Sequence, residues 1–193
     1  MSLPVESKLS GLKAPLRFDV NLSRYSTIQI GGPARYFAEP ASFSELQAVL
    51  YFAREEGLPV LSIGKGSNTL FPDEGYPGLV ITFIHFEPHK IVCDPERSVM
   101  TASSGVSLYR LALAARDAGL GGAEFLSHIP GTLGGALIMN AGFSRFPGQK
   151  MEIGDYVEEV TVLTSEGEIR TLGRNELNFG YRKSNLEGLM ILE

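Results

Sequence analysis

The chain has 193 residues, and its content of 44% hydrophobic and 20% charged residues is typical of a globular protein and not of a disordered one. A formal net charge of −5 leaves no domain-wide basic field, which argues against nucleic acid as the main partner. The single cysteine, Cys93, excludes an internal disulfide, and the three histidines lack the spacing of a metal site. Without a long apolar run or a secretory signal, we expect a cytoplasmic protein that has neither a metal nor a membrane partner.

Strand and helix patterns alternate in both halves of the chain, which predicts an α+β protein with two small lobes. Charged and turn-forming residues between Glu87 and Arg97 mark the boundary between the halves. We therefore expect an extended lead-in over residues 1–20, a first lobe over residues 21–86 and a second lobe over residues 87–193.

The first lobe is predicted to open, within residues 27–38, with a strand, a tight turn at Gly31-Gly32-Pro33 and a second strand. Ser44 is the predicted N-cap of a helix, because Gln47 follows it at capping-box spacing, and Gly57 is placed to end that helix. Two further strands are predicted, over residues 60–63 and 79–83.

In the second lobe, Ser107 is predicted to cap a helix and Gly119 to end it. The segment that follows, residues 120–149, is rich in glycine. The remaining predicted elements are strands over residues 99–102, 157–164, 168–172 and 188–193, with a hairpin turn at 165–167.

The segment Gly64-Lys65-Gly66-Ser67-Asn68 follows directly after a predicted buried strand. Its two glycines allow a ligand to approach the backbone closely, and consecutive N–H groups of such a loop can hold phosphate oxygens. The segment matches neither the Walker loop nor the Rossmann fingerprint. From these residues alone, a pyrophosphate site and a plain glycine-rich turn both stay open.

A second motif is the run from Ile129 to Ala136, in which Pro130-Gly131 forms a turn and Thr132 is a candidate cap for a helix that starts at Leu133. The positive end of that helix would attract an anion, and Gly134 and Gly135 leave its first turn bare enough for a flat group to pack there. Tight helix packing explains the two glycines equally well.

The third motif is Phe179-Gly180-Tyr181-Arg182-Lys183-Ser184. An arginine beside a tyrosine and two residues before a serine is suited to hold a carboxylate in bidentate fashion. On spacing alone, a surface ion pair with a packed tyrosine is the preferred interpretation.

Taken in order along the chain, these motifs resemble the UDP-N-acetylenolpyruvoylglucosamine reductase family of flavoenzymes. The resemblance covers the chain from about residue 20 onward, and the ordered set is more specific than any one motif. Its segments are Ser26 to Ala34, Gly64 to Asn68 with Asp73-Glu74-Gly75, Gly122 to Gly142, Ile153-Gly154-Asp155 and Phe179 to Ser184.

The resemblance implies a two-lobed FAD-binding fold of the vanillyl-alcohol-oxidase type, with non-covalent FAD held between the lobes. It also implies NADPH as the reductant and an enolpyruvyl UDP-sugar as the substrate, in the synthesis of peptidoglycan. The loop of Gly64, Lys65, Gly66, Ser67 and Asn68 would sit on the FAD pyrophosphate. The other implied flavin contacts are Ile129, Pro130, Gly131, Thr132, Gly134, Gly135, Asn140, Ala141 and Gly142.

Arg182 matches the family's arginine that stabilises negative charge as it develops on the substrate carboxylate, a task suited to a guanidinium. Tyr181 is implied as a support beside the substrate, and Ser184 as a positioning residue. In the family, a serine assisted by a glutamate protonates the product from a C-terminal domain that also binds the UDP-sugar. No residue of this sequence matches that pair, so we expect the substrate domain to be missing and the reaction to need more than this chain.

Two local departures from the family pattern are Lys65, where a small residue is common, and Phe143-Ser144-Arg145-Phe146-Pro147, in place of an Ala-Tyr-Gly stretch. Two alternatives stay open: a flavin- or nucleotide-binding module without turnover, and another oxidoreductase on the same flavin fold. Such oxidases often attach FAD covalently, and the candidates for that role are Cys93 and His128. Neither lies in a recognisable attachment motif.

Overall fold

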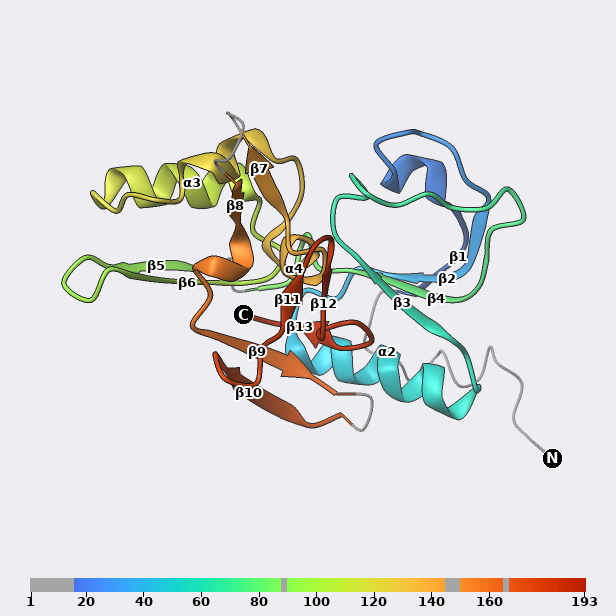
Figure 1. Cartoon of the computed structure of the whole chain (residues 1–193). Helices are drawn as coiled ribbons and strands as arrows, with labels where there is room; N and C mark the ends of the chain where they lie inside the picture. Colours follow the sequence, from blue (N-terminus) through green and yellow to red (C-terminus); the bar gives the residue numbers. More distant parts are fainter. Residues whose placement is uncertain (1–15, 88–89, 145–149, 165–166) are drawn as a thin grey trace. The chain divides into compact units, whose positions relative to one another are not determined.

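The computed structural model describes residues 16–87, 90–144, 150–164 and 167–193, and it divides the chain into two compact units (Figure 1). Unit 1 extends from Met1 to Glu87 and unit 2 from Pro88 to Glu193. Of the predicted lead-in, residues 1–15 lie outside the described residues, and residues 16–20 belong to the first strand. Within the described ranges, none of the helices has the length and apolar character that a membrane span requires.

Unit 1 is built on a four-stranded sheet of order β1-β2-β4-β3. β1 pairs antiparallel with β2, whereas β2, β4 and β3 run parallel to one another. The elements of this unit are β1 (Leu16–Asn21), the 3-10 helix η1 (Leu22–Tyr25), β2 (Pro33–Ala38), α2 (Phe43–Glu55), β3 (Val60–Ile63) and β4 (Tyr76–Thr82).

Different segments cover the two faces of this sheet. On one face, the ring of Phe52 in α2 meets the ring of Tyr36 in β2 edge-on, with centroids 5.2 Å apart. On the opposite face, Leu22 of η1 is fully buried against a cluster that includes Phe37 and Val80. Because neighbouring residues of a strand point to opposite faces, Tyr36 and Phe37 each anchor one of these two layers.

The start of α2 differs from the prediction, which placed the N-cap at Ser44. The N-cap is Ser42, whose hydroxyl accepts a hydrogen bond from the Glu45 N–H at 3.3 Å, and the Glu45 carboxylate accepts one from the Ala41 N–H at 2.7 Å. The prediction was wrong by two residues because it paired a serine with Gln47, whereas Glu45 is the residue that folds back over the helix start. The predicted end at Gly57 is confirmed, since this glycine has φ +61° directly after the last turn.

The strand predicted at the start of residues 27–38 is wrong, although β2 confirms the second one. Thr27 donates its N–H to the Gly66 carbonyl at 3.1 Å, and Gln29 has φ +60°, far from the extended backbone of a regular strand. Ile28 and Ile30 are both exposed, so this segment does not alternate between core and solvent. The predicted strands at 60–63 and 79–83 are found as β3 and as the end of β4.

Unit 2 contains a three-stranded antiparallel sheet of order β10-β9-β13 and three two-stranded antiparallel pairs. The pairs are β5 with β6, β7 with β8, and β11 with β12. Its elements are β5 (Ile91–Asp94), β6 (Val99–Ala102), α3 (Leu108–Asp117), η2 (Glu124–His128), α4 (Leu133–Ile138), β7 (Gly142–Ser144), β8 (Lys150–Glu152), η3 (Ile153–Asp155), β9 (Glu159–Leu163), β10 (Ile169–Gly173), β11 (Phe179–Gly180), β12 (Lys183–Ser184) and β13 (Met190–Ile191).

The core of unit 2 gathers buried side chains from helix α3, the glycine-rich segment and sheet β10-β9-β13. Ser107 caps α3 by accepting from the Arg110 N–H at 3.3 Å, and Gly119 follows its end with φ +72°, as predicted. The core residues include Leu108, Leu111, Phe125, Leu126, Ala136, Leu137, Val160, Val162, Leu186 and Ile191.

Two strand predictions in unit 2 need correction. The strand predicted over 188–193 is only the two-residue β13, because Gly188 has φ +82° and pairing with β9 begins at Met190. β5 was not predicted, and it pairs with β6 along its whole length. Of the turn predicted at 165–167, residues 165–166 lie outside the described residues; the strands on either side are β9 and β10.

Candidate functional site

The Gly64–Asn68 loop leaves the carboxyl end of β3, next to the carboxyl end of the parallel strand β4. In open sheets with parallel strands, ligands bind in the crevice outside the carboxyl ends of the strands. Lys65 and Asn68 are exposed, whereas Gly66 is buried. The loop therefore presents its backbone and one positive side chain at an edge suited to an anion.

Gly66 has a geometric requirement for glycine. Its φ is +63°, and a Cβ atom on it would lie 1.8 Å from the carbonyl oxygen of Tyr25. Its own carbonyl accepts the N–H of Thr27 at 3.1 Å. The loop is thus fastened to the segment after η1, and only a residue without a side chain permits that approach.

Two further segments of the resemblance, Ser26 to Ala34 and Asp73-Glu74-Gly75, pack against each other. Gly32 and Gly75 both donate their N–H groups to the Pro72 carbonyl, at 2.8 and 3.0 Å. A Cβ on Gly32 would lie 2.0 Å from the Asp73 carbonyl oxygen, and one on Gly75 would lie 1.9 Å from that of Pro33. These glycines allow two backbones to touch beside the Gly64–Asn68 loop.

In unit 2, helix α4 begins at Leu133 as predicted, but its N-terminus does not offer the anion site that the sequence suggested. Thr132 is buried and makes no side-chain capping bond. The Leu133 N–H is donated to the Val106 carbonyl and the Gly134 N–H to the Ser104 carbonyl, both at 2.9 Å. Because protein carbonyls already occupy these two donors, they are not available to an anion.

The two glycines of α4 serve different purposes. A Cβ on Gly134 would lie 3.0 Å from the Cβ of Ser104, so the tight packing considered above applies at this position. Gly135 is exposed, and a Cβ there would meet only the Thr132 hydroxyl, at 3.6 Å. Gly135 therefore carries the bare surface against which a flat group could pack.

Asn140 is buried in unit 2 and connects three segments. Its side chain is 2% exposed; Nδ2 donates to the Gly180 carbonyl and Oδ1 accepts the Gly154 N–H, each at 3.0 Å. Its φ of +42° is in the left-handed region, which asparagine tolerates better than most residues. The neighbouring Ala141 is buried, and a Cβ on Gly142 would lie 2.5 Å from the Met151 carbonyl oxygen.

The third motif forms a hairpin of strands β11 and β12 with Tyr181 and Arg182 at its tip. Tyr181 is 74% exposed, and Arg182 is exposed with φ +56°. The Arg182 guanidinium carbon lies 5.8 Å from the centre of the Tyr181 ring, and the Lys150 ammonium nitrogen lies 5.1 Å from it. Among the described residues Arg182 forms no ion pair, so the surface ion pair preferred on spacing alone is not found.

Ser184 fastens this hairpin to the end of α4. Its hydroxyl donates to the Ile138 carbonyl at 2.9 Å and accepts the Leu186 N–H at 3.4 Å. Together with the bond from Asn140 to Gly180, it sets where the Tyr181–Arg182 tip lies within unit 2. The hydroxyl is committed to backbone partners, which suits a positioning residue.

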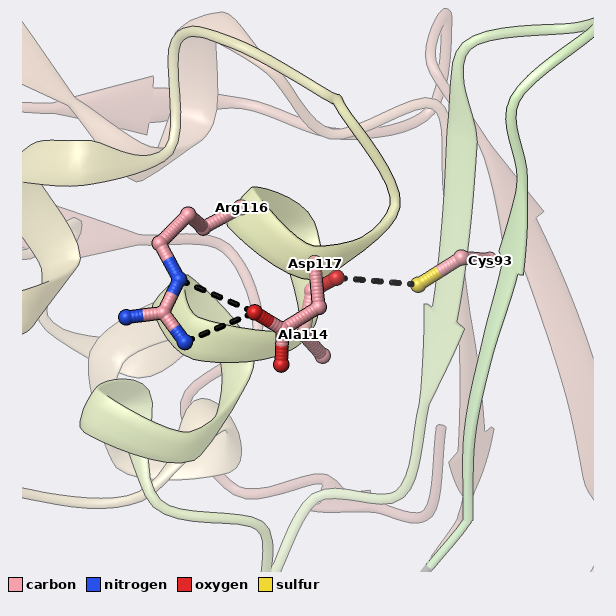
Figure 2. Close-up of polar contacts among 4 residues, drawn as sticks. All are labelled: Cys93, Ala114, Arg116 and Asp117. Atoms are coloured by element: carbon pink, nitrogen blue, oxygen red, sulfur yellow. Dashed lines mark hydrogen bonds and ion pairs between the residues drawn. The ribbon is translucent and has the colours of Figure 1, made fainter.

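Cys93 and His128, the candidates for covalent attachment, both have structural partners. Figure 2 shows Cys93 on β5 with its thiol directed at the Ala114 carbonyl of α3, at 3.7 Å. The His128 ring stacks on Phe143 with centroids 5.0 Å apart, and its Nδ1 lies 3.1 Å from the Ser127 hydroxyl. Because that hydroxyl donates its only proton to the Glu124 carbonyl at 2.6 Å, Nδ1 is the donor of the pair. The segment Phe143 to Pro147, which departs from the family pattern, is described only as far as Ser144, because residues 145–149 lie outside the described residues.

Two residues that no motif singled out carry buried hydroxyls without a hydrogen-bond partner in the described structure. They are Thr82, at the end of β4, and Ser104, after β6. Each is next to a predicted contact segment: Thr82 is the register partner of Ile63, which precedes Gly64, and Ser104 accepts the Gly134 N–H. Donors without a partner beside both motifs fit a ligand rich in oxygen acceptors, as FAD is. No signal in the sequence identified them.

The described residues hold no group of three or more histidine, cysteine, aspartate or glutamate side chains that are placed to bind a metal ion.

Comparison with known proteins gives a family and a set of relatives. Residues 34–173 match the model of the FAD binding domain family. A UDP-N-acetylenolpyruvoylglucosamine reductase from Lactobacillus delbrueckii subsp. bulgaricus is 40% identical over 183 residues, which are 93% of this chain and 59% of that protein. The chain thus spans about three-fifths of the length of that relative.

Solved structures agree with this result. The crystal structure of UDP-N-acetylenolpyruvylglucosamine reductase from Thermus caldophilus matches with a TM-score of 0.71 and 34% identity, over 93% of this chain and 60% of that one. Xylooligosaccharide oxidase from Myceliophthora thermophila C1 matches with a TM-score of 0.62 at 17% identity, over 94% of this chain and 42% of that one, and shows the fold alone. The predicted resemblance and the α+β flavin-binding fold of the vanillyl-alcohol-oxidase type are confirmed.

Proposed function

The chain belongs to the FAD binding domain family, and on that premise we propose that it carries the flavin-binding part of a UDP-N-acetylenolpyruvoylglucosamine reductase. The proposed reaction is the NADPH-dependent reduction of UDP-N-acetylglucosamine enolpyruvate to UDP-N-acetylmuramate, for peptidoglycan synthesis in the cytoplasm. The observation that carries the proposal is 40% identity to such a reductase over 93% of the chain.

FAD is the proposed cofactor, and when bound it supplies hydride transfer. The residues that would hold its pyrophosphate are Gly64, Lys65, Gly66, Ser67 and Asn68. The support for this role is their place at the carboxyl edge of parallel strands, with the backbone held open by Gly66. The flavin contacts proposed in unit 2 are Ile129, Pro130, Gly131, Thr132, Gly134, Gly135, Asn140, Ala141 and Gly142.

These unit 2 residues divide by what they do in the structure. Gly135 is exposed and bare, and so offers a surface to a flat ring. Asn140, in contrast, has both polar atoms of its side chain committed to Gly154 and Gly180. We therefore propose that Gly135 touches the cofactor directly, whereas the side chain of Asn140 supports the segment and its backbone N–H is donated to the Leu137 carbonyl at 3.3 Å.

Arg182 is the proposed catalytic residue of this chain. Its guanidinium is exposed at the hairpin tip, where it can pair with the substrate carboxylate and stabilise charge that develops there. The centre of the Tyr181 ring lies 5.8 Å from the Arg182 guanidinium carbon, so this ring is the proposed support for the arginine. Ser184 is proposed to position the hairpin through its hydrogen bond to the Ile138 carbonyl.

Binding of FAD is the first test. The purified chain is titrated with FAD, freed of excess, and its visible spectrum recorded, then NADPH is added without oxygen. We expect a retained flavin band that NADPH bleaches, and FAD released intact on denaturation, which separates this proposal from a covalent flavin oxidase. A folded chain that retains no FAD would contradict the proposal.

The role of Arg182 is tested by substrate binding. UDP-N-acetylglucosamine enolpyruvate should perturb the flavin spectrum of the loaded protein, and Arg182→Met should weaken that response about tenfold or more, as loss of a charge-assisted pair does. Lys183→Met is the matched control, because it removes the neighbouring cation and should leave the response within about twofold. A response of Arg182→Met within about twofold of wild type would contradict this role.

A further inference from the structure

Two buried hydroxyls in the described part of the chain have no hydrogen-bond partner, Thr82 Oγ1 and Ser104 Oγ. Thr82 is 0% exposed and Ser104 is 4% exposed. Buried hydroxyl groups in folded proteins are nearly always paired, and an exception calls for an explanation. These two lie in different units and on different kinds of segment, so a single local packing defect does not account for both.

In unit 1, Thr82 is the last residue of β4 and lies beside Ile63 in the neighbouring parallel strand. The Gly64–Asn68 loop begins at the residue after Ile63. The unpaired hydroxyl therefore lies at the sheet edge from which the proposed pyrophosphate loop departs, where phosphate oxygens would accept a hydrogen bond.

In unit 2, every polar atom of Ser104 except the hydroxyl is engaged. Its N–H donates to the Leu192 carbonyl and its own carbonyl accepts the Gly134 N–H, both at 2.9 Å. A Cβ on Gly134 would lie 3.0 Å from the Ser104 Cβ, so the serine side chain directly borders the Ile129–Gly135 motif. The adjacent Ser103 is different, because its hydroxyl accepts the Lys90 N–H at 3.1 Å.

We infer that Thr82 and Ser104 are FAD-binding residues whose hydroxyls donate hydrogen bonds to the cofactor. Thr82 would reach the pyrophosphate, and Ser104 would reach a polar atom of the flavin ring. Both oxygens are covered by protein atoms, which must move aside for the hydroxyls to reach the ligand. This inference rests on the proposed binding of FAD and adds two residues to its site.

The test measures two quantities on the full chain: the Kd for FAD, from quenching of flavin fluorescence, and the unfolding midpoint of the FAD-free protein. Thr82→Val and Ser104→Ala remove one hydroxyl each and keep most of the side-chain shape. We expect each to raise the Kd about five- to tenfold, the loss of about one hydrogen bond. We also expect each to raise the unfolding midpoint without FAD, because an unpaired buried hydroxyl is removed.

The opposite directions of these two effects separate binding from structure. Ser103→Ala is the control, because its hydroxyl already has a partner; it should lower the midpoint and leave the Kd within about twofold. Thr82→Ser, which keeps a hydroxyl, should bind FAD more tightly than Thr82→Val.

Two results would overturn the inference. If the wild-type chain binds FAD and Thr82→Val and Ser104→Ala bind it equally well, FAD binding stands and the two hydroxyls have no part in it. If both variants lower the midpoint of the FAD-free chain, the hydroxyls have partners already. A wild-type chain that binds no FAD would refute the proposed function itself, and the inference with it.

Discussion

Asn140 and Gly180 lie 40 residues apart in the sequence and are joined by a hydrogen bond of 3.0 Å from the Asn140 side-chain amide to the Gly180 carbonyl. The oxygen of the same side chain accepts the Gly154 N–H, also at 3.0 Å. One buried amide thus holds η3 and the base of the hairpin whose tip carries Arg182. Since the side chain is 2% exposed, water cannot replace either bond when it is lost.

Replacing Asn140 should destabilise unit 2. Asn140→Ala removes both hydrogen bonds and places alanine at φ +42°, so we expect the free energy of unfolding to fall by about 2–4 kcal/mol. Urea denaturation measures this change. Asn140→Gly loses the same bonds but tolerates the backbone angle, so its loss should be smaller. Unchanged stability in both variants would show that the amide does not hold these segments together.

Gly66 and Gly57 form a matched pair for testing the Gly64–Asn68 loop. Both have positive φ, +63° and +61°, but a Cβ on Gly66 would lie 1.8 Å from the Tyr25 carbonyl oxygen, whereas one on Gly57 meets nothing within 4 Å. Gly57→Ala should therefore cost about 1 kcal/mol of stability through backbone strain alone.

Gly66→Ala should cause the same backbone strain and should also displace the Gly64–Asn68 loop. The affinity for FAD should then fall at least about tenfold, because the backbone N–H groups proposed to bind the phosphates are moved. Fluorescence titration with FAD and urea unfolding are run on both variants. Equal FAD affinity in Gly66→Ala and Gly57→Ala would argue against a pyrophosphate role for this loop.

The position of the N-cap of α2 can be tested directly. Ser42→Ala removes the acceptor for the Glu45 N–H and should lower the free energy of unfolding by about 1 kcal/mol. Ser44→Ala, within the first turn, should change it by no more than about 0.5 kcal/mol. Thermal or urea unfolding of the two variants measures the difference, and the reverse order would restore the cap position expected from the sequence.

Tyr76 predicts a dependence of stability on alkaline pH. Burial raises the pKa of the Tyr76 phenol from its ordinary value of 10.0. The folded state therefore holds this proton more tightly than the unfolded state. The resulting stability is fully present below the ordinary pKa and is lost as pH rises through the folded-state pKa. Tyr76→Phe cannot ionise, so its free energy of unfolding should fall less than that of wild type between about pH 8 and pH 11. Parallel curves for the two proteins would contradict this prediction.

Local sequence signals predicted the elements that depend on local geometry. Gly57 and Gly119 end their helices because only a residue near the left-handed region closes the last turn, and Ser107 caps α3 through a bond three residues away. The failure at residues 27–30 has a cause that is not local. Residues 27–30 look like a strand by composition, but their hydrogen bond from Thr27 goes to Gly66, far along the chain, and the backbone turns instead.

The sequence by itself determined the α+β class, the two helices α2 and α3, and the ordered glycine motifs that identify the flavin-binding family, because these depend on residue type and spacing along the chain. The tertiary structure decided what each of those residues does. It assigned the first donors of α4 to protein carbonyls, committed Asn140 to Gly154 and Gly180, and left Thr82 and Ser104 with unpaired hydroxyls. Hydrogen-bond partners that lie 30 or 40 residues apart, such as Ser104 with Gly134 and Asn140 with Gly180, follow from chain packing, which no local pattern specifies.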